Sequence, residues 1–416
     1  MTAYQNEIER HYRPVRHYDL QRVAKRLLWR NATQWKEQKR IASCCWNCSG
    51  NGVTVYRAKD GSRARFGGLV TCGSVWECIV CAQKISERRR EELQIANQVA
   101  LGIGYVAYFL TFTHPHVSGQ ALELMLEAQL RAMRRFKQSR QYRNTWERYG
   151  RLGSVRAREV TVSVLHGWHP HVHELVYAAQ GLLGADDQVI DARAVRDLKR
   201  AWLWACLREG LIKPDGTLKP FRDFWRHGLK IQGGAYAADY IAGYGSDKHY
   251  GLAEEMTAGA TKQGRRRGDW LQGMHFTPWQ LLEWSKEGDA QSDAMFREYA
   301  AAFEGKRQLV WSPKLKRAFG ILDLTDAELA EATNVPKKPE EEIAARLSLD
   351  QWGQLLRHAY IKIGGVMADS RAHLLGLART YGRAGVQAFF EELDNLHPSA
   401  RGNFLGLVLW KPGAYQ

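Results

Sequence analysis

No apolar run of about 18 residues occurs in this chain, so the sequence predicts no transmembrane helix and no membrane partner. The first twenty residues, MTAYQNEIERHYRPVRHYDL, also lack the apolar core of a secretory signal. No segment recurs at a fixed period, which argues against a repeat architecture. We therefore expect a soluble protein that is located in the cytoplasm.

Acidic residues are scarce in most of the chain. The 416 residues include 60 Lys and Arg against 44 Asp and Glu, a net charge of +16. Residues 321–416 hold 10 basic and 12 acidic residues, which leaves a net charge of +18 on residues 1–320. Such a basic body, with 15 Trp and 17 Tyr in the chain, is typical of nucleic-acid binding, because cations attract phosphates and aromatic rings stack on unpaired bases. A basic surface kept for solubility is the alternative explanation.

The pattern of apolar residues predicts an α+β fold with a central antiparallel sheet. The expected strands are 104–113, 155–165 and 171–179, and the last two form a hairpin through His166-Gly167-Trp168. The expected helices are 5–40, 83–101, 120–139, 192–209 and 234–244. We divide the chain into a basic helical segment (1–40), a cysteine-rich module (41–95), a central domain (96–320) and a mostly helical C-terminal region (321–416).

Six of the seven cysteines lie between residues 41 and 82. Two pairs, Cys45-x2-Cys48 and Cys78-x2-Cys81, are separated by 29 residues and can bind one Zn²⁺ tetrahedrally in a ribbon-like module. Cys44 and Cys72 are additional candidates, and Cys72 can replace a member of the first pair. Disulfides are disfavoured inside cells, so structural zinc is the preferred interpretation.

Three histidines crowd the segment GWHPHVH, residues 167–173. Alternate residues of a strand point to the same face, so His171 and His173 face one way while Val172 faces the core. Glu159, on the preceding strand of the hairpin, can lie alongside them. Imidazole and carboxylate ligands suit Mn²⁺, Mg²⁺ or Zn²⁺ and leave positions open for a substrate oxygen. Two exposed histidines without a ligand are the alternative.

Tyr236, Tyr240 and Tyr244 recur every four residues, so on a helix they share one face. A metal ion beside a basic, aromatic surface suggests phosphodiester chemistry, in which a phenol can serve as a nucleophile and form a covalent phosphotyrosine. Ordinary packing is the alternative explanation for tyrosines at this spacing.

Several segments of the chain, in the same order along the sequence, resemble the HUH-endonuclease replication initiators of rolling-circle plasmids. The name refers to two histidines around a hydrophobic residue, here His171-Val172-His173. The matching segments are TCGSVWECIVCAQKI (71–85), FLTFTHP (109–115), REVTVSVLHGWHPHVHELVY (158–177), YIAGYGSDKHYGLAEEMTAGATKQGR (240–265), FTPWQLL (276–282) and LVWSPKLKRAFG (309–320). The resemblance covers roughly residues 41–335 and leaves out the last 80 or so.

The resemblance implies an HUH-type palm, in which helices flank a central antiparallel sheet that carries a divalent metal, Mn²⁺ or Mg²⁺. His171 and His173 are the implied ligands. Glu159 is the expected acidic ligand, and His169 is the alternative. The cysteine-rich module would hold a separate structural Zn²⁺.

The resemblance also implies a tyrosine that nicks one strand at a plasmid origin, stays on the 5′-phosphate and leaves a free 3′-OH primer. Tyr240 is the preferred nucleophile, because it opens the segment YIAGYG, and Tyr236 or Tyr244 can be a second tyrosine. The implied partners are single-stranded and supercoiled origin DNA and a host polymerase. A host helicase is also expected, because the chain contains no G-x-x-x-x-G-K-[ST] phosphate loop.

The chain departs from the family at two positions. Many relatives have a lysine three residues after the tyrosine, where this chain has Gly243. Lys248 or Lys262 can replace that charge, and Arg265 is a further candidate for DNA binding. Ile79 stands where relatives often have proline between the last two cysteines, which should not affect metal ligation.

Other classes fit parts of the sequence. HPHVHELV (169–176) also matches histidine-triad nucleotide hydrolases, but these are small and explain neither the cysteines nor the tyrosines. Zinc base deaminases need an H-x-E motif ahead of C-x-x-C, and that order is absent. A non-catalytic, zinc-containing DNA-binding regulator could share the fold. HUH transposases and relaxases are the nearest relatives, although relaxases place the tyrosine before the histidines.

Overall fold

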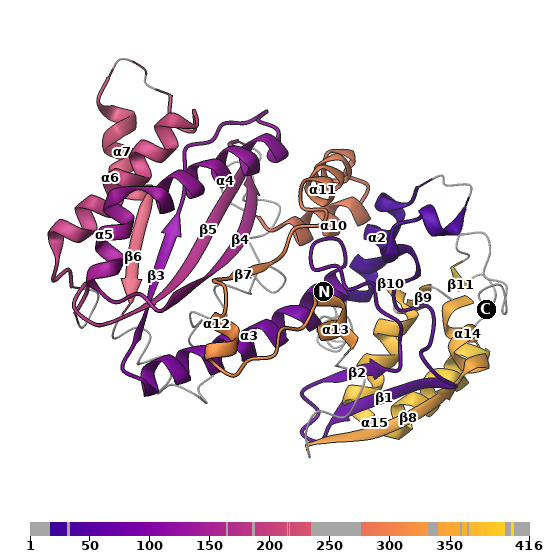
Figure 1. Ribbon diagram of the computed structural model, residues 1–416. Helices are drawn as coiled ribbons and strands as arrows, with labels where there is room; N and C mark the ends of the chain where they lie inside the picture. The colour runs from indigo at the N-terminus through magenta and orange to yellow at the C-terminus, as the bar shows by residue number, and fades with distance from the viewer. Residues whose placement is uncertain are drawn as a thin grey trace. The chain divides into compact units, whose positions relative to one another are not determined.

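The computed structural model describes residues 17–30, 34–163, 165–184, 188–213, 215, 217–233, 276–331, 340–357, 360–363, 366–395 and 401–402. The chain forms two compact units (Figure 1). The first combines Met1–Lys84 with Thr325–Gln416, and the second is Ile85–Leu324. Antiparallel sheets and helices occur in both units, which confirms the predicted α+β class. Within the described residues, no helix is long and apolar enough to cross a membrane.

The second unit is built on a five-stranded antiparallel sheet with the order β6-β3-β5-β4-β7 (Figure 1). Its strands are β3 (Val106–Phe112), β4 (Gly153–Ser163), β5 (Gly167–Ala178), β6 (Leu229–Gly233) and β7 (Leu309–Trp311). β4 and β5 form the predicted hairpin and pair along their whole length. β3 and β5 are almost continuously buried, as expected for central strands that are covered on both faces.

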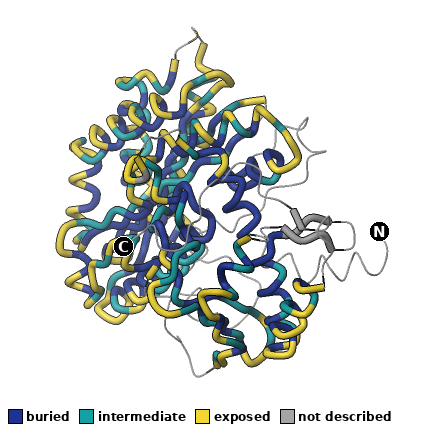
Figure 2. Tube along the Cα trace, turned by 90° about the vertical axis from the view of Figure 1, so that its right-hand side faces the viewer, coloured by how far each residue is buried: buried dark blue, intermediate teal, exposed yellow. Residues whose placement is uncertain are grey.

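Helices cover both faces of this sheet. They are α3 (Ile79–Gly102), α4 (Leu122–Gln138), α5 (Arg140–Arg148), α6 (Ala192–Arg208), α7 (Lys219–His227), α10 (Pro278–Lys286), α11 (Ala290–Ala302) and α12 (Leu315–Ala318). On one face, Phe112 packs against Trp202 of α6, with ring centroids 5.0 Å apart. On the other, Tyr177 packs against Phe319, just after α12. Several helices are buried along one side and exposed along the other (Figure 2).

The first unit joins the two ends of the chain through one shared sheet, and C-terminal strands alone form a second sheet. One sheet has the order β2-β1-β8 and the other β10-β9-β11. The strands are β1 (Gly52–Ala58), β2 (Ala64–Gly67), β8 (Glu341–Ser348), β9 (Tyr360–Ile363), β10 (Val366–Asp369) and β11 (Arg401–Gly402). The helices are α2 (His17–Leu28), η2 (Trp35–Glu37), η3 (Arg40–Ser43), α13 (Asp326–Glu331), α14 (Leu349–Arg357) and α15 (Ser370–Asn395).

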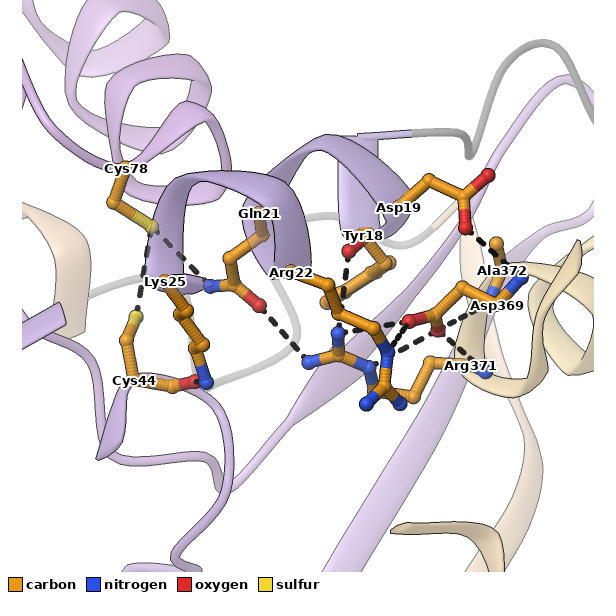
Figure 3. A network of polar contacts seen from close by, with 10 residues as sticks. All are labelled: Tyr18, Asp19, Gln21, Arg22, Lys25, Cys44, Cys78, Asp369, Arg371 and Ala372. Atoms are coloured by element: carbon orange, nitrogen blue, oxygen red, sulfur yellow. Dashed lines mark hydrogen bonds and ion pairs between the residues drawn. The ribbon is translucent and has the colours of Figure 1, made fainter. Parts of the chain in front are cut away.

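A buried ion network fastens the C-terminal part to α2 (Figure 3). Asp369 accepts hydrogen bonds from Arg22 and from Arg371, and Arg371 also donates to the side chain of Gln21 at 2.9 Å. Burial alone would raise the pKa of Asp369, but the two guanidiniums hold it well below its usual range. A buried charge is tolerated only when it is paired in this way.

Helices α13, α14 and α15 make up most of the described C-terminal region, but the region also contributes strands that were not predicted from the sequence. β8 pairs with β1 over the full length of both strands. Such a strand is hard to predict from its own sequence, because apolar and polar residues alternate only weakly in EEIAARLS. Its partner strand also lies far away in the chain.

Candidate metal centres

The histidine-rich strand β5 and its hairpin partner β4 bring three predicted ligands together. Glu159 lies directly opposite His171 in the strand register. His171 and His173 share a face of β5, because they are two residues apart. The ligand atoms of Glu159, His171 and His173 all lie within 4.8 Å of one another. This arrangement can offer one carboxylate and two imidazoles to a single cation.

His173 is the most constrained member of this group. Its side chain is only 6% exposed, and its ring stacks on Phe109 with centroids 5.2 Å apart. Its Nε2 lies 3.0 Å from Oε2 of Glu159, and its Nδ1 lies 3.2 Å from Oγ1 of Thr111. If Nε2 offers its lone pair to a metal, Nδ1 must carry the proton and donate it to Thr111. The hydroxyl of Thr111 on β3 can accept a hydrogen bond from that proton, so this contact fits the tautomer that a metal ligand needs.

His169, the predicted alternative ligand, lies against His171, with Nδ1 of His169 3.0 Å from Nε2 of His171. On its other side the His169 ring stacks on His116, with centroids 4.1 Å apart. The sequence analysis missed both His116 and Thr111. Both residues lie in or just after the segment FLTFTHP, which could have drawn attention to them. Only the fold shows that the strand of this segment pairs with β5.

The donor set fits a divalent cation. Two imidazoles and one carboxylate suit a borderline or hard ion such as Mn²⁺, and three protein donors leave coordination positions open. The side chains of His173 and Glu159 are only 6% and 10% exposed, whereas His171 is partly exposed, so an incoming ligand would reach the site from the side of His171.

A second group of ligand atoms lies in the first unit, where four buried thiols converge. They belong to Cys44, Cys72, Cys78 and Cys81. The Sγ of Cys44 lies 3.7 Å from that of Cys78 and 3.6 Å from that of Cys81, and the Sγ atoms of Cys72 and Cys81 are 3.5 Å apart. Tetrahedral Zn²⁺ with Zn–S bonds of about 2.3 Å places its sulfurs about 3.8 Å apart. The four thiols therefore fit zinc.

The geometry favours Cys44 over the two members of the first predicted pair. Cys45 adopts a left-handed backbone conformation, with φ of 57°, and its N–H donates to the carbonyl of Val70. Cys48 is half-buried and forms an isolated bridge with Leu69. Neither belongs to the four-thiol group, whereas Cys72, Cys78 and Cys81 do.

Neighbouring polar groups suit a negatively charged tetrathiolate centre (Figure 3). Gln21 donates from Nε2 to Sγ of Cys78 at 3.2 Å, and the N–H of Cys72 points to Sγ of Cys44 at 3.3 Å. Lys25 donates to the carbonyl of Cys44 at 2.6 Å. Burial lowers the pKa of Lys25 to about 7, an effect that four metal-bound thiolates would oppose. Such contacts orient and stabilise the ligands of a metal site.

Replacing Cys44 with serine is expected to reduce bound zinc from one ion per chain to well below half an ion, because one of four thiolates is lost. Cys48→Ser is the matched control and should keep its zinc. Elemental analysis of protein purified without chelator measures both. Full zinc in Cys44→Ser together with loss in Cys48→Ser would show that the first CxxC pair, not Cys44, supplies the ligands.

Six predicted site residues lie outside the described part of the chain, between residues 234 and 275. They are Tyr236, Tyr240, Tyr244, Lys248, Lys262 and Arg265. The described residues on either side lie in, or are hydrogen-bonded to, the sheet that carries the histidines. β6 ends at Gly233, and Phe276 exchanges backbone hydrogen bonds of 2.7 and 2.9 Å with Val162 of β4.

Two curated proteins are similar to this chain over part of its length. "Protein rep" from Streptomyces lividans is 32% identical in an alignment of 153 residues that covers 30% of this chain and 33% of that protein. "Neomycin resistance protein" from Streptomyces cyanogenus is 31% identical in an alignment of 150 residues that covers 30% of this chain and 34% of that protein. The chain thus spans about a third of the length of the curated relatives it matches.

No protein-family model matches the chain, and no solved structure matches it significantly.

Proposed function

We propose that this protein initiates rolling-circle plasmid replication by nicking and rejoining single-stranded DNA at the origin. The observation that carries the proposal is the placement of Glu159, His171 and His173 on two paired strands, with ligand atoms within 4.8 Å of one another. β5 is the middle strand of a five-stranded antiparallel sheet covered by helices on both faces, which supports an HUH-type palm.

The residues of the site would bind a cation and leave part of its coordination sphere accessible to DNA. Bound Mn²⁺ or Mg²⁺ would act as a Lewis acid that polarises an oxygen of the scissile phosphate. Glu159, His171 and His173 would hold the ion, and Thr111 fixes the ring of His173. His171 is partly exposed, so a DNA strand would reach the site from the side of His171.

Tyr240 is the proposed nucleophile. Its phenol oxygen forms a bond to phosphorus as the phenol proton leaves, and the bond from phosphorus to the 3′-oxygen breaks. The departing 3′-oxygen takes up a proton and becomes the primer for a host polymerase. The phosphotyrosine keeps the energy of the phosphodiester, so the reverse reaction rejoins the strand without ATP. A host helicase would open the duplex ahead of synthesis.

The test uses single-stranded oligonucleotides tiled across the replicon's origin, labelled at either the 5′ or the 3′ end, with purified protein and Mn²⁺. A denaturing gel should show a covalent adduct that carries the 3′ label and not the 5′ label, because the tyrosine keeps the 5′-phosphate. Tight binding of the same oligonucleotides without cleavage or adduct would replace the proposal with a non-catalytic DNA-binding regulator.

Thr111→Val is expected to weaken Mn²⁺ binding about 10- to 100-fold, the usual cost of losing a group that orients a metal-ligating histidine. Valine has nearly the same shape and favours strands, so the fold should be kept. Thr111→Ser retains the hydroxyl and is the control. Electron paramagnetic resonance of free Mn²⁺ during titration, in the absence of DNA, measures the affinity. Equal Mn²⁺ affinities for the valine variant and the wild type would remove Thr111 from this role.

A further inference from the structure

Four basic side chains gather on the sheet face opposite the histidine site. Arg156 and Arg158 are alternate residues of β4, so both point away from the face that carries Glu159. Arg134 and Lys137 belong to α4, which packs on that opposite face. Arg134 lies close enough to Arg156 for its positive charge to lower the pKa of Arg156. We call these four residues the β4–α4 cationic strip.

The carboxylate of Glu174 compensates part of the positive charge of the strip. Glu174 is fully buried, lies opposite Arg156 in the strand register and forms an ion pair with Lys137. Arg158 lies opposite Val172 and forms no ion pair within the described residues. The nearest charge felt by Arg158 is Arg156. Four cations against one carboxylate leave an excess of three positive charges.

The two strand arginines are only half exposed, which makes this excess unfavourable in the protein alone. Burial lowers the pKa of both guanidiniums. For Arg156 the carboxylate of Glu174 opposes this effect on the pKa while Arg134 adds to it, and for Arg158 the like charge of Arg156 lowers the pKa further. The Nε of Arg156 is buried without a hydrogen-bond partner among the described atoms. A buried donor without a hydrogen-bond partner costs free energy. Like charges that are partly buried also cost free energy unless a bound anion neutralises them.

The chemistry of the strip selects a phosphate chain as that anion. A guanidinium presents a planar fork that fits phosphate oxygens with two hydrogen bonds. Arg156 and Arg158 are about 7 Å apart along the strand, so they can contact separate phosphates of one backbone. A small carboxylate ligand would use only one of them.

We propose that the β4–α4 cationic strip binds the phosphodiester backbone of DNA that flanks the cleaved phosphate. The nature of the ligand rests on the proposed function. Arg158 and Glu159 are neighbours in β4, and their side chains leave on opposite faces. The strip therefore contacts a different stretch of DNA from the stretch at the metal centre, and it adds affinity without taking part in the chemistry.

Fluorescence anisotropy with a labelled single-stranded oligonucleotide, without added divalent metal, tests the strip. Arg158→Gln should weaken binding about tenfold, the effect of losing one charge-assisted hydrogen-bonded contact. The slope of log affinity against log salt concentration should fall by about 0.7 for that contact. Arg193→Gln removes an exposed cation from the start of α6 and should leave both affinity and slope unchanged.

Two further variants keep the test decisive. Arg134 is exposed, so Arg134→Gln should fold normally and reduce the slope even if Arg158→Gln proves unstable. Arg158→Lys keeps the charge and should retain most of the salt dependence. Lower thermal stability of Arg158→Gln with wild-type DNA binding, or a wild-type slope in Arg134→Gln, would reduce the strip to an internal ion network. If the variants reduce the salt dependence of DNA binding but the wild-type protein never cleaves DNA, the strip binds DNA and the proposed nicking activity is wrong.

Discussion

His173→Ala is expected to lower the rate of DNA nicking by at least about a thousandfold, because it removes a metal ligand whose Lewis-acid contribution is several kcal/mol. Binding of single-stranded DNA should change little, since it comes from phosphate contacts spread over the basic surface. His171→Ala should behave in the same way and costs less packing, because His171 is half-buried while His173 stacks on Phe109. Initial rates with labelled origin DNA and Mn²⁺ measure the effect.

The control is His227→Ala, which removes an exposed histidine at the end of α7 in the same unit. It should nick DNA at the wild-type rate. Mn²⁺ titration of each variant separates loss of the ligand from loss of the fold, because a folded variant without the site binds DNA but not the ion. Wild-type nicking by the His171→Ala/His173→Ala double variant in the presence of chelator would end the metal hypothesis.

The hairpin that carries this site could be predicted because its signals are local. The alternation of β5 places Val172 in the core and both histidines on the other face, and the short connection at Gly167 makes β4 the neighbouring strand. The predicted approach of Glu159 to the histidines follows from that register. Thr111 and His116 could not be assigned in this way, because their contacts depend on which strand pairs with the other edge of β5.

The thiol group shows where spacing alone is insufficient. The sequence places Cys44, Cys45 and Cys48 within five residues, and any of them could complete a set with the later cysteines. The choice depends on the backbone of Cys45, whose left-handed conformation and hydrogen bond to Val70 turn the chain at this point. Both are properties of the folded module. The pairing of β8 with β1 escaped prediction for a similar reason, since its partner lies at the far end of the chain.

Tyr240→Phe is expected to eliminate the covalent protein–DNA adduct completely, because the change removes the single oxygen that attacks phosphorus. The ring remains, so the fold and DNA binding should be kept. The segment that carries Tyr240 leaves the sheet after β6 and returns at Phe276 beside β4, the strand that carries Glu159. The described residues at the two ends of this segment are thus held by strand β6 and by a backbone bridge to β4, both in the sheet that holds the histidines.

The two neighbouring tyrosines provide the matched controls, since Tyr236→Phe and Tyr244→Phe make the same one-atom change. If Tyr240 acts alone, both controls form the adduct at the wild-type level. If two tyrosines alternate across successive nicks, one control makes the first cut and fails in the terminating transfer. Peptide mapping of the adduct by mass spectrometry identifies the residue that carries the nucleotide. A nucleotide on Tyr236 or Tyr244 with Tyr240 unmodified would move the nucleophile along the segment. A digest in which no tyrosine carries DNA would leave this protein without its proposed enzymatic class, because a phosphotyrosine is the only intermediate that the proposed rejoining can use.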